Sequence, residues 1–183
     1  MKRKTLDLVF SFGGLVTAAL ILVLGLVMNN EATFARNYVK EQFAEQRISF
    51  TPAEFLTDEE KGADACILAN AGKPLETGEQ AACYANFYIG THLTAINEGK
   101  TYSETSTQAR EAHAAATAAA EANEPNAEAL EAEAKVLDGK ADSLFRGESL
   151  RGLLLTAYGF SILGARAGQA ATVAFLVAGA DKA

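Results

Sequence analysis

The chain has 183 residues, of which 49% are apolar, and its formal net charge is -7 at pH 7. The charge is unevenly distributed, because positions 29–149 hold 21 acidic and 10 basic side chains and the rest of the chain holds 2 acidic and 6 basic ones. Phosphate backbones and anionic headgroups repel such an acidic segment, so this composition excludes a nucleic-acid-binding protein.

The first apolar segment runs from Leu8 to Met28 and contains no charged residue. As a helix it would be about 31 Å long, which matches the thickness of a bilayer's hydrocarbon core. Three cations at positions 2–4 precede it, and such flanks stay in the cytoplasm. The pattern predicts a transmembrane helix at 8–28 with residues 1–7 in the cytoplasm. The alternative is a signal peptide cleaved between Ala32 and Ala35, although such peptides have a shorter apolar core.

The second apolar segment, residues 151–180, predicts another transmembrane helix, with an outer end that lies at the membrane interface. It would return residues 181–183 to the cytoplasm and leave residues 29–150 outside. Arg166 interrupts this segment about 12 Å from the outer end of a helix that begins near Tyr158. A charge at that depth normally faces a partner or water rather than lipid.

Small residues beside Arg166 indicate close helix packing. Gly164 and Gly168 form a GxxxG pattern, which lets two helix backbones approach each other. We therefore expect Gly164, Arg166 and Gly168 to form an interface with another membrane protein, although glycine is also common in any transmembrane helix. A similar stripe at Gly14 and Ala18 predicts that the two transmembrane helices pack on each other.

The acidic region between the apolar segments has the pattern of helices joined by turns, so we predict an all-α fold with an extracytoplasmic helical domain. The first transmembrane helix should continue outward as a stalk, and a new helix should follow the break at Thr51-Pro52. Residues 57–76 should be irregular. A capping-box pattern at residues 77–80 predicts a helix that ends near Asn97.

An alanine- and glutamate-rich stretch follows, and residues 103–128 contain no large aliphatic or aromatic side chain. Alanine has the highest helix propensity, and Pro125-Asn126 is the one strong break in the stretch. The sequence predicts a helical hairpin here. Disorder is the alternative, because alanine buries little surface.

Cys66 and Cys83 are the two cysteines of the chain, and both fall in the predicted exterior domain. Outside the cytoplasm such a pair predicts a disulfide. The alternative is a metal site completed by His92, although this spacing matches no standard zinc pattern. We expect His92 instead to pack in the core beside Tyr88 as a neutral, hydrogen-bonded ring.

Residue patterns that carry catalysis are missing from the sequence. It has no glycine-rich phosphate loop, nucleophile elbow, CxxC, HExxH or haem-attachment motif. His113 lies among alanines and is expected at the surface. The sequence therefore predicts no catalytic, cofactor-binding or metal-binding residue and disfavours an enzyme.

Four strings from residue 87 onward are distinctive: Phe87 to Leu93, Gly99 to Tyr102, Leu144 to Leu155 and Ala157 to Gly159. They resemble strings of a group of small actinobacterial membrane proteins. Proteins of this group share a basic N-terminus, an anchor helix, a helical exterior domain and a final transmembrane helix, but not the cysteine pair or the alanine-rich hairpin. Some small actinobacterial proteins of this build accompany the respiratory supercomplex as accessory subunits, so the resemblance implies a similar role.

Two hypotheses follow for the function. The first is a non-catalytic accessory or scaffold subunit of a larger complex in the plasma membrane, favoured by the small-residue stripe, by Arg166 and by the lack of catalytic motifs. The second is a membrane-anchored extracytoplasmic sensor or ligand-binding module that recognises a cation or an envelope component through its acidic face. A solvated acidic face that binds nothing is the simpler interpretation of that charge.

Overall fold

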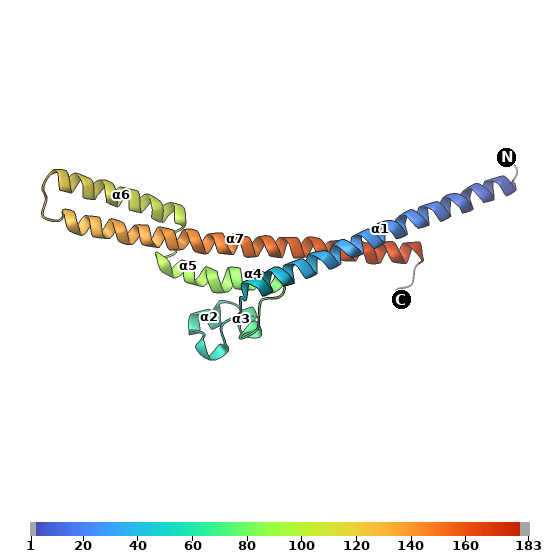
Figure 1. Cartoon of the computed structure of the whole chain (residues 1–183), viewed down its shortest axis with the longest axis horizontal. Helices are drawn as coiled ribbons and strands as arrows, with labels where there is room; N and C mark the ends of the chain where they lie inside the picture. Colours follow the sequence, from blue (N-terminus) through green and yellow to red (C-terminus); the bar gives the residue numbers. More distant parts are fainter. Residues whose placement is uncertain (1–2, 180–183) are drawn as a thin grey trace. The chain divides into compact units, whose positions relative to one another are not determined.

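The structure is a computed structural model that describes residues 3–179, and Figure 1 shows the course of the chain. Every named element in this part of the chain is helical, as the sequence predicts. An isolated bridge between Ser49 and Pro74 is the one β-type pairing among these residues. The elements are α1 (Arg3–Gln46), η1 (Ala53–Phe55), α2 (Asp58–Ala63), α3 (Ala65–Asn70), α4 (Gly78–Cys83), η2 (Tyr84–Ile89), α5 (Gly90–Ile96), α6 (Tyr102–Glu121) and α7 (Ala127–Ala178).

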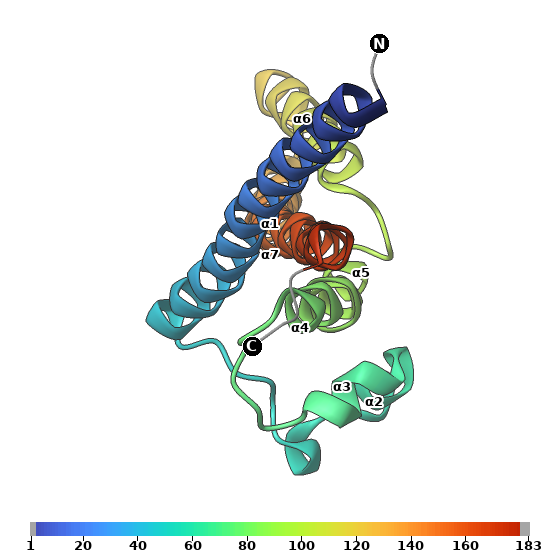
Figure 2. The same ribbon diagram turned by 90° about the vertical axis from the view of Figure 1, so that its right-hand side faces the viewer.

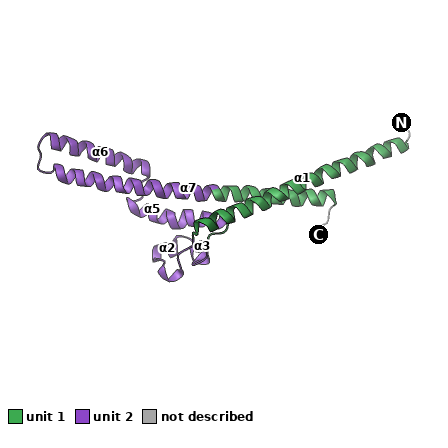
Figure 3. Cartoon of the chain, viewed as in Figure 1, with its two compact units in different colours: residues 1–48, 75–78, 157–183 green, residues 49–74, 79–156 purple. Residues whose placement is uncertain are grey.

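The chain forms two compact units, which Figure 3 distinguishes by colour. Unit 1 comprises residues 1–48, 75–78 and 157–183, and unit 2 comprises residues 49–74 and 79–156. The helix α7 belongs to both units, because it continues without a break from Ala127 to Ala178. The exterior domain predicted from sequence and the compact unit 2 therefore have different boundaries.

Unit 1 is built on α1 and the part of α7 from residue 157 onward. These two helices run in opposite directions (Figure 1), and Figure 2 shows α1 crossing α7. The predicted stalk is confirmed as helix, since α1 continues past the apolar segment to Gln46. Both α1 and α7 are long and apolar enough to cross a membrane. The predicted C-terminal cytoplasmic residues 181–183 lie outside the described residues, as do positions 1 and 2.

Unit 2 begins with short elements that were not predicted. Residues 57–76 contain two six-residue helices, α2 and α3, so the expectation of an irregular segment was wrong. A capping box starts α2, because the Thr57 side chain accepts a hydrogen bond from the Glu60 backbone and the Glu60 carboxylate accepts one from the Thr57 backbone. The break near Pro52 leads only to the short 3-10 helix η1, in which no side-chain cap forms.

The predicted helix at 77–97 is present from Gly78 to Ile96, but it is not a uniform α-helix. Its middle six residues form the π-helical segment η2, between α4 and α5. Four apolar residues, spaced four apart along this continuous helix, are buried: Ala81, Ala85, Ile89 and Leu93. The helix ends at Ile96, and Gly99 adopts a positive φ of 78° in the turn that follows.

The alanine-rich hairpin is ordered and consists of α6 and the first part of α7, separated by the turn around Pro125. A second capping box, between Thr101 and Glu104, starts α6. Buried alanines from both helices allow close packing, namely Ala109, Ala116, Ala119, Ala134 and Ala141. A polar network closes the base of the hairpin, where the Asn97 amide donates to Thr105 and Gln108 and accepts a hydrogen bond from Lys140.

Candidate functional site: the helix seam and the hairpin groove

In unit 1, Gly164 and Gly168 of α7 pack against alanines of α1. A Cβ atom placed on Gly164 would lie 2.5 Å from the Ala35 Cβ, which is closer than side chains approach. A Cβ atom on Gly168 would lie 3.4 Å from the Ala32 Cβ. Both predicted glycines therefore mediate close helix approach, and the helix that approaches them is α1 of the same chain.

The α1 side of this contact differs from the sequence prediction. A Cβ atom at Gly14 would meet nothing within 4 Å, so the predicted stripe at Gly14 and Ala18 does not make the contact. Buried small residues further along α1 make it instead: Gly25, Ala32 and Ala35. Gly25 faces Ala174 and Phe175. We call the α1 and α7 residues at this contact the helix seam.

The seam residues that sequence reasoning missed have a recognisable spacing. Buried positions of α1 recur at residues 25, 32 and 39, seven apart, with Ala35 between the last two. Buried positions of α7 recur at 164 and 171. A seven-residue repeat of buried positions is the pattern of two helices that pack along their length. Its signal in the sequence is weak, because glycine and alanine occupy most of these positions and Val39 is the only larger residue among them.

Arg166 does not lie with the two glycines. It is exposed, and its guanidinium donates a hydrogen bond of 3.1 Å to the Gln169 side chain, three residues away on α7. Gly164 is buried in the seam, whereas Arg166 faces away from it. The structure therefore separates the three predicted interface residues onto two faces, and their contact with a partner stays a prediction.

In unit 2, Cys66 and Cys83 form the predicted disulfide, with their Cα atoms 6.2 Å apart. The bond joins α3 to the end of α4 across 17 residues of sequence. It thereby ties the two short helices to the long helical segment that follows. Because both sulfur atoms belong to this bond, neither cysteine is free to bind a metal together with His92, which was the alternative interpretation.

His92 was predicted to be buried in the core, but about half of its side chain is exposed. Its ring packs edge-on against Tyr88, as expected, with the two ring centroids 4.6 Å apart. Its Nε2 atom lies 2.8 Å from a carboxylate oxygen of Glu60, which is buried. Hydrogen bonds from the backbone N–H and hydroxyl of Thr57 lower the pKa of Glu60 against the effect of burial, and His92 lowers it further. The contact between Glu60 and His92 thus reinforces the start of α2.

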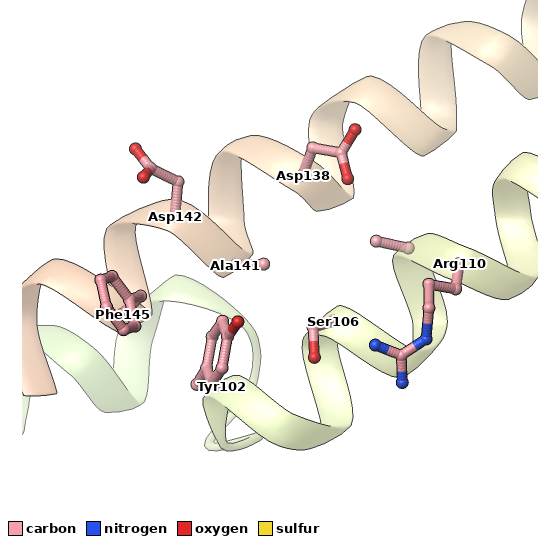
Figure 4. A pocket seen from close by; sticks show the side chains of 8 residues that line it. Tyr102, Ser106, Arg110, Asp138, Ala141, Asp142 and Phe145 are labelled. Carbon is pink, nitrogen blue, oxygen red and sulfur yellow. The ribbon is translucent and has the colours of Figure 1, made fainter.

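The α6–α7 hairpin has a groove of about 370 Å³ between its two helices, shown in Figure 4. Tyr102 and Phe145 form one end of it, with ring centroids 5.5 Å apart, and both side chains are substantially exposed. Arg110 lies at the other end, on α6. The remaining lining residues are Ser106, Ala109, Asp138, Ala141 and Asp142.

The acidic side chains of this groove have partners, whereas its arginine has no acidic partner. Asp142 forms an ion pair with Arg146, and Asp138 lies 2.7 Å from His113. The hydrogen bond to Asp138 is the main reason why the pKa of His113 is raised above its ordinary value. Arg110 donates only to the Thr107 hydroxyl, and within the described chain it has no carboxylate at ion-pair distance. The groove thus offers one free cation beside two exposed rings.

A second hollow in unit 2, of about 550 Å³, is lined partly by Asn86, Phe87 and Arg151. The Arg151 guanidinium donates to Asn86 and to Glu148 through its terminal nitrogens. Its Nε atom is buried without any hydrogen-bond partner, which is uncommon in folded proteins. The hollow lies beside the π-helical segment η2, and π-helical turns are frequent at functional sites.

The fold and these surfaces define an all-helical protein with two candidate membrane helices and a disulfide-linked helical unit. Comparison with known proteins adds no relative: no family model, no curated protein and no solved structure matches the chain. The resemblance to actinobacterial membrane proteins therefore stays a prediction from the sequence.

Proposed function

We propose that the protein is a non-catalytic accessory or scaffold subunit of a larger complex in the plasma membrane. One observation carries this proposal: between Leu6 and Met28 the large apolar side chains of α1 are exposed along most of the helix, including Phe10 at 72%. Soluble proteins rarely expose a continuous apolar surface of this size. A lipid bilayer or another membrane protein has to cover it.

The proposed orientation places the N-terminus in the cytoplasm, because the basic residues precede the apolar segment of α1. Residues 29–150 are then extracytoplasmic, in an oxidising compartment that favours the bond between Cys66 and Cys83. Their net charge of -11 keeps them away from anionic headgroups. Unit 2 is thus available to a protein partner.

The groove on the hairpin is the proposed contact of the exterior part with that partner. Exposed aromatic rings and arginine are the residue types that dominate binding energy at protein interfaces. Tyr102 and Phe145 supply the rings, and Arg110 has no carboxylate at ion-pair distance among residues 3–179. We propose that a partner segment places an apolar side chain on the rings and a carboxylate on Arg110. A respiratory membrane complex is the first partner to test, because of the sequence resemblance.

The test is purification in mild detergent from native membranes, followed by identification of the proteins that remain bound at high salt. A stoichiometric integral membrane partner is expected. Phe145→Ala should weaken its retention, whereas Val136→Ala should not, since Val136 is an equally exposed apolar residue of α7 outside the groove. Recovery of the wild-type chain as a lone monomer refutes the proposal.

A second candidate function is the membrane-anchored sensor or ligand-binding module, which the hollow beside η2 favours. The unpartnered Arg151 Nε atom borders a space that could admit an acceptor group of an envelope component. Thermal stabilisation of the purified exterior region by an anionic envelope fragment, lost in Arg151→Lys, would favour this function. Equal melting temperatures with and without the fragments would remove it.

A further inference from the structure

The register of the helix seam bears on how the chain crosses the membrane. Three facing pairs fix this register: Gly25 with Phe175, Ala32 with Gly168, and Ala35 with Gly164. In each pair the two residue numbers add up to about 200. A position on α7 therefore faces the α1 position whose number is about 200 minus its own.

This register offsets the two apolar segments. The charge-free segment of α1 ends on its outer side at Met28. The last residue of α7, Ala178, faces position 22 of α1 and lies only about 9 Å inward of Met28, at 1.5 Å per residue. The hydrocarbon core is about 30 Å thick, so α7 stops within the outer leaflet. In Figure 3, α1 continues well beyond the end of α7 within unit 1.

The end of α7 is marked by a conformational break. Gly179 has a positive φ of 73°, and its N–H donates to the Leu176 carbonyl. A left-handed residue directly after the last turn is a common way to end a helix. Residue 179 therefore stops α7 before it could approach the cytoplasmic end of α1.

A different position of the bilayer along the helix seam does not let both α1 and α7 cross the membrane. If residues 157–178 of α7 filled the hydrocarbon core, positions 22–43 of α1 would accompany them. Five charged residues would then enter the core: Glu31, Arg36, Lys40 and Glu41 of α1, and Arg166 of α7. Charged residues in the core are strongly disfavoured, whereas the placement at 8–28 buries none of them.

The placement at 8–28 also accounts for Arg166. In the seam register Arg166 lies level with position 34 of α1, about 9 Å outward of Met28. That is the level of the headgroups, where a guanidinium can bind lipid phosphate. The exposed apolar residues of the last turns lie level with positions 23–27 of α1, among outer-leaflet acyl chains; they are Val173, Leu176 and Val177.

We propose that α1 crosses the bilayer and α7 does not: α7 packs on the extracytoplasmic extension of α1 and inserts only its last two turns into the outer leaflet. Arg166 then lies at the exterior surface. This topology differs from the two-pass arrangement with both termini in the cytoplasm that the sequence predicts. It does not depend on the identity of any partner.

Cysteine labelling distinguishes the two topologies. Ala165 is exposed beside Arg166 and carries no charge, so Ala165→Cys leaves the guanidinium in place. The two native cysteines are already bonded and give no background. With an impermeant maleimide and right-side-out vesicles, Ala165→Cys should label as fast as the exterior control Glu128→Cys. Leu20→Cys, in the membrane core, should label only after detergent is added.

A cross-link tests the register in the same membranes. Ala32→Cys with Gly168→Cys should form a disulfide on mild oxidation, because the two Cβ positions are 3.4 Å apart. Cross-linking together with external labelling of Ala165→Cys supports the proposal. Protection of Ala165→Cys to the same degree as Leu20→Cys overturns it, and so does the absence of the cross-link.

Discussion

The helix seam predicts a graded response to alanine at three glycines of α7. A Cβ atom would lie 2.5 Å from the Ala35 Cβ at Gly164 and 3.4 Å from the Ala32 Cβ at Gly168, and it would meet nothing within 4 Å at Gly159. Alanine gains about 1 kcal/mol of helix propensity over glycine at each position. That gain cancels when the three variants are compared with one another.

The difference between the variants then measures the crowding in the seam. Overpacking of a closely packed site costs about 1 to 3 kcal/mol. We therefore expect Gly164→Ala to be less stable than Gly159→Ala by about 1 to 3 kcal/mol. Gly168→Ala should lie close to Gly159→Ala, because its new methyl group makes an ordinary contact with Ala32.

Tryptophan fluorescence can report this stability. The chain has no tryptophan, so Phe160→Trp places a single reporter in unit 1, where Phe160 packs edge-on against Tyr38 with ring centroids 5.9 Å apart. Denaturant titration in mild detergent should show separation of the two helices as a change in emission. The reasoning is refuted if Gly164→Ala and Gly159→Ala have the same midpoint.

Three further predictions concern unit 2. Reduction of the bond between Cys66 and Cys83 should lower the free energy of unfolding by about 3 kcal/mol, as measured by guanidinium denaturation with and without reductant. The pKa of His113 is higher in the folded than in the unfolded state, so protonated His113 stabilises the fold fully below about pH 6.5 and this effect is lost as the pH rises through the raised pKa. The difference in thermal stability between pH 6 and pH 8 should therefore be smaller in His113→Gln than in the wild type. Because Thr57 lowers the pKa of Glu60, the wild type should be more stable than Glu60→Gln at neutral pH and should lose this advantage as the pH falls below about 4.

Each of these predictions has an outcome that would contradict it. Unchanged stability after complete reduction would show that α3 is held to the rest of unit 2 by packing alone. An undiminished pH dependence in His113→Gln would assign the effect to other groups. A constant difference between wild type and Glu60→Gln from pH 7 to about pH 3 would mean that the charge of Glu60 does not stabilise α2.

The sequence predicted the long helices and the hairpin because their signals are local. A charge-free apolar segment and one strong break at Pro125-Asn126 determine helix positions without reference to the rest of the fold. The disulfide was predictable for a similar reason, since only two cysteines are present. The helices α2 and α3 were missed because each has six residues, too few to show an apolar period. The capping box at Thr57 and Glu60 was the signal that could have located α2.

The candidate sites were less predictable, because they depend on which helix faces which. A pair of small residues shows that a helix can be approached closely, but it does not show by what. Gly164 and Gly168 were therefore found, whereas the α1 residues that meet them were placed fourteen or more positions too early, at Gly14 and Ala18. The exposure of His92 could not be predicted either, since it depends on the position of Glu60 in α2.

The π-helical segment η2 has a consequence for insertions and deletions in this helix. On an α-helix, each step of four residues turns the side-chain direction by about 40° around the axis. In a regular α-helix, Leu93 would therefore point about 120° away from Ala81 and leave the core, with Ala85 and Ile89 in between. A π-helix has more residues per turn, so a step of four turns the side-chain direction the opposite way and returns these residues to the same face. All four residues are buried. Deletion of one residue within 84–89 would restore a regular α-helix and turn either the Cys83 side or the His92 side away from its contacts.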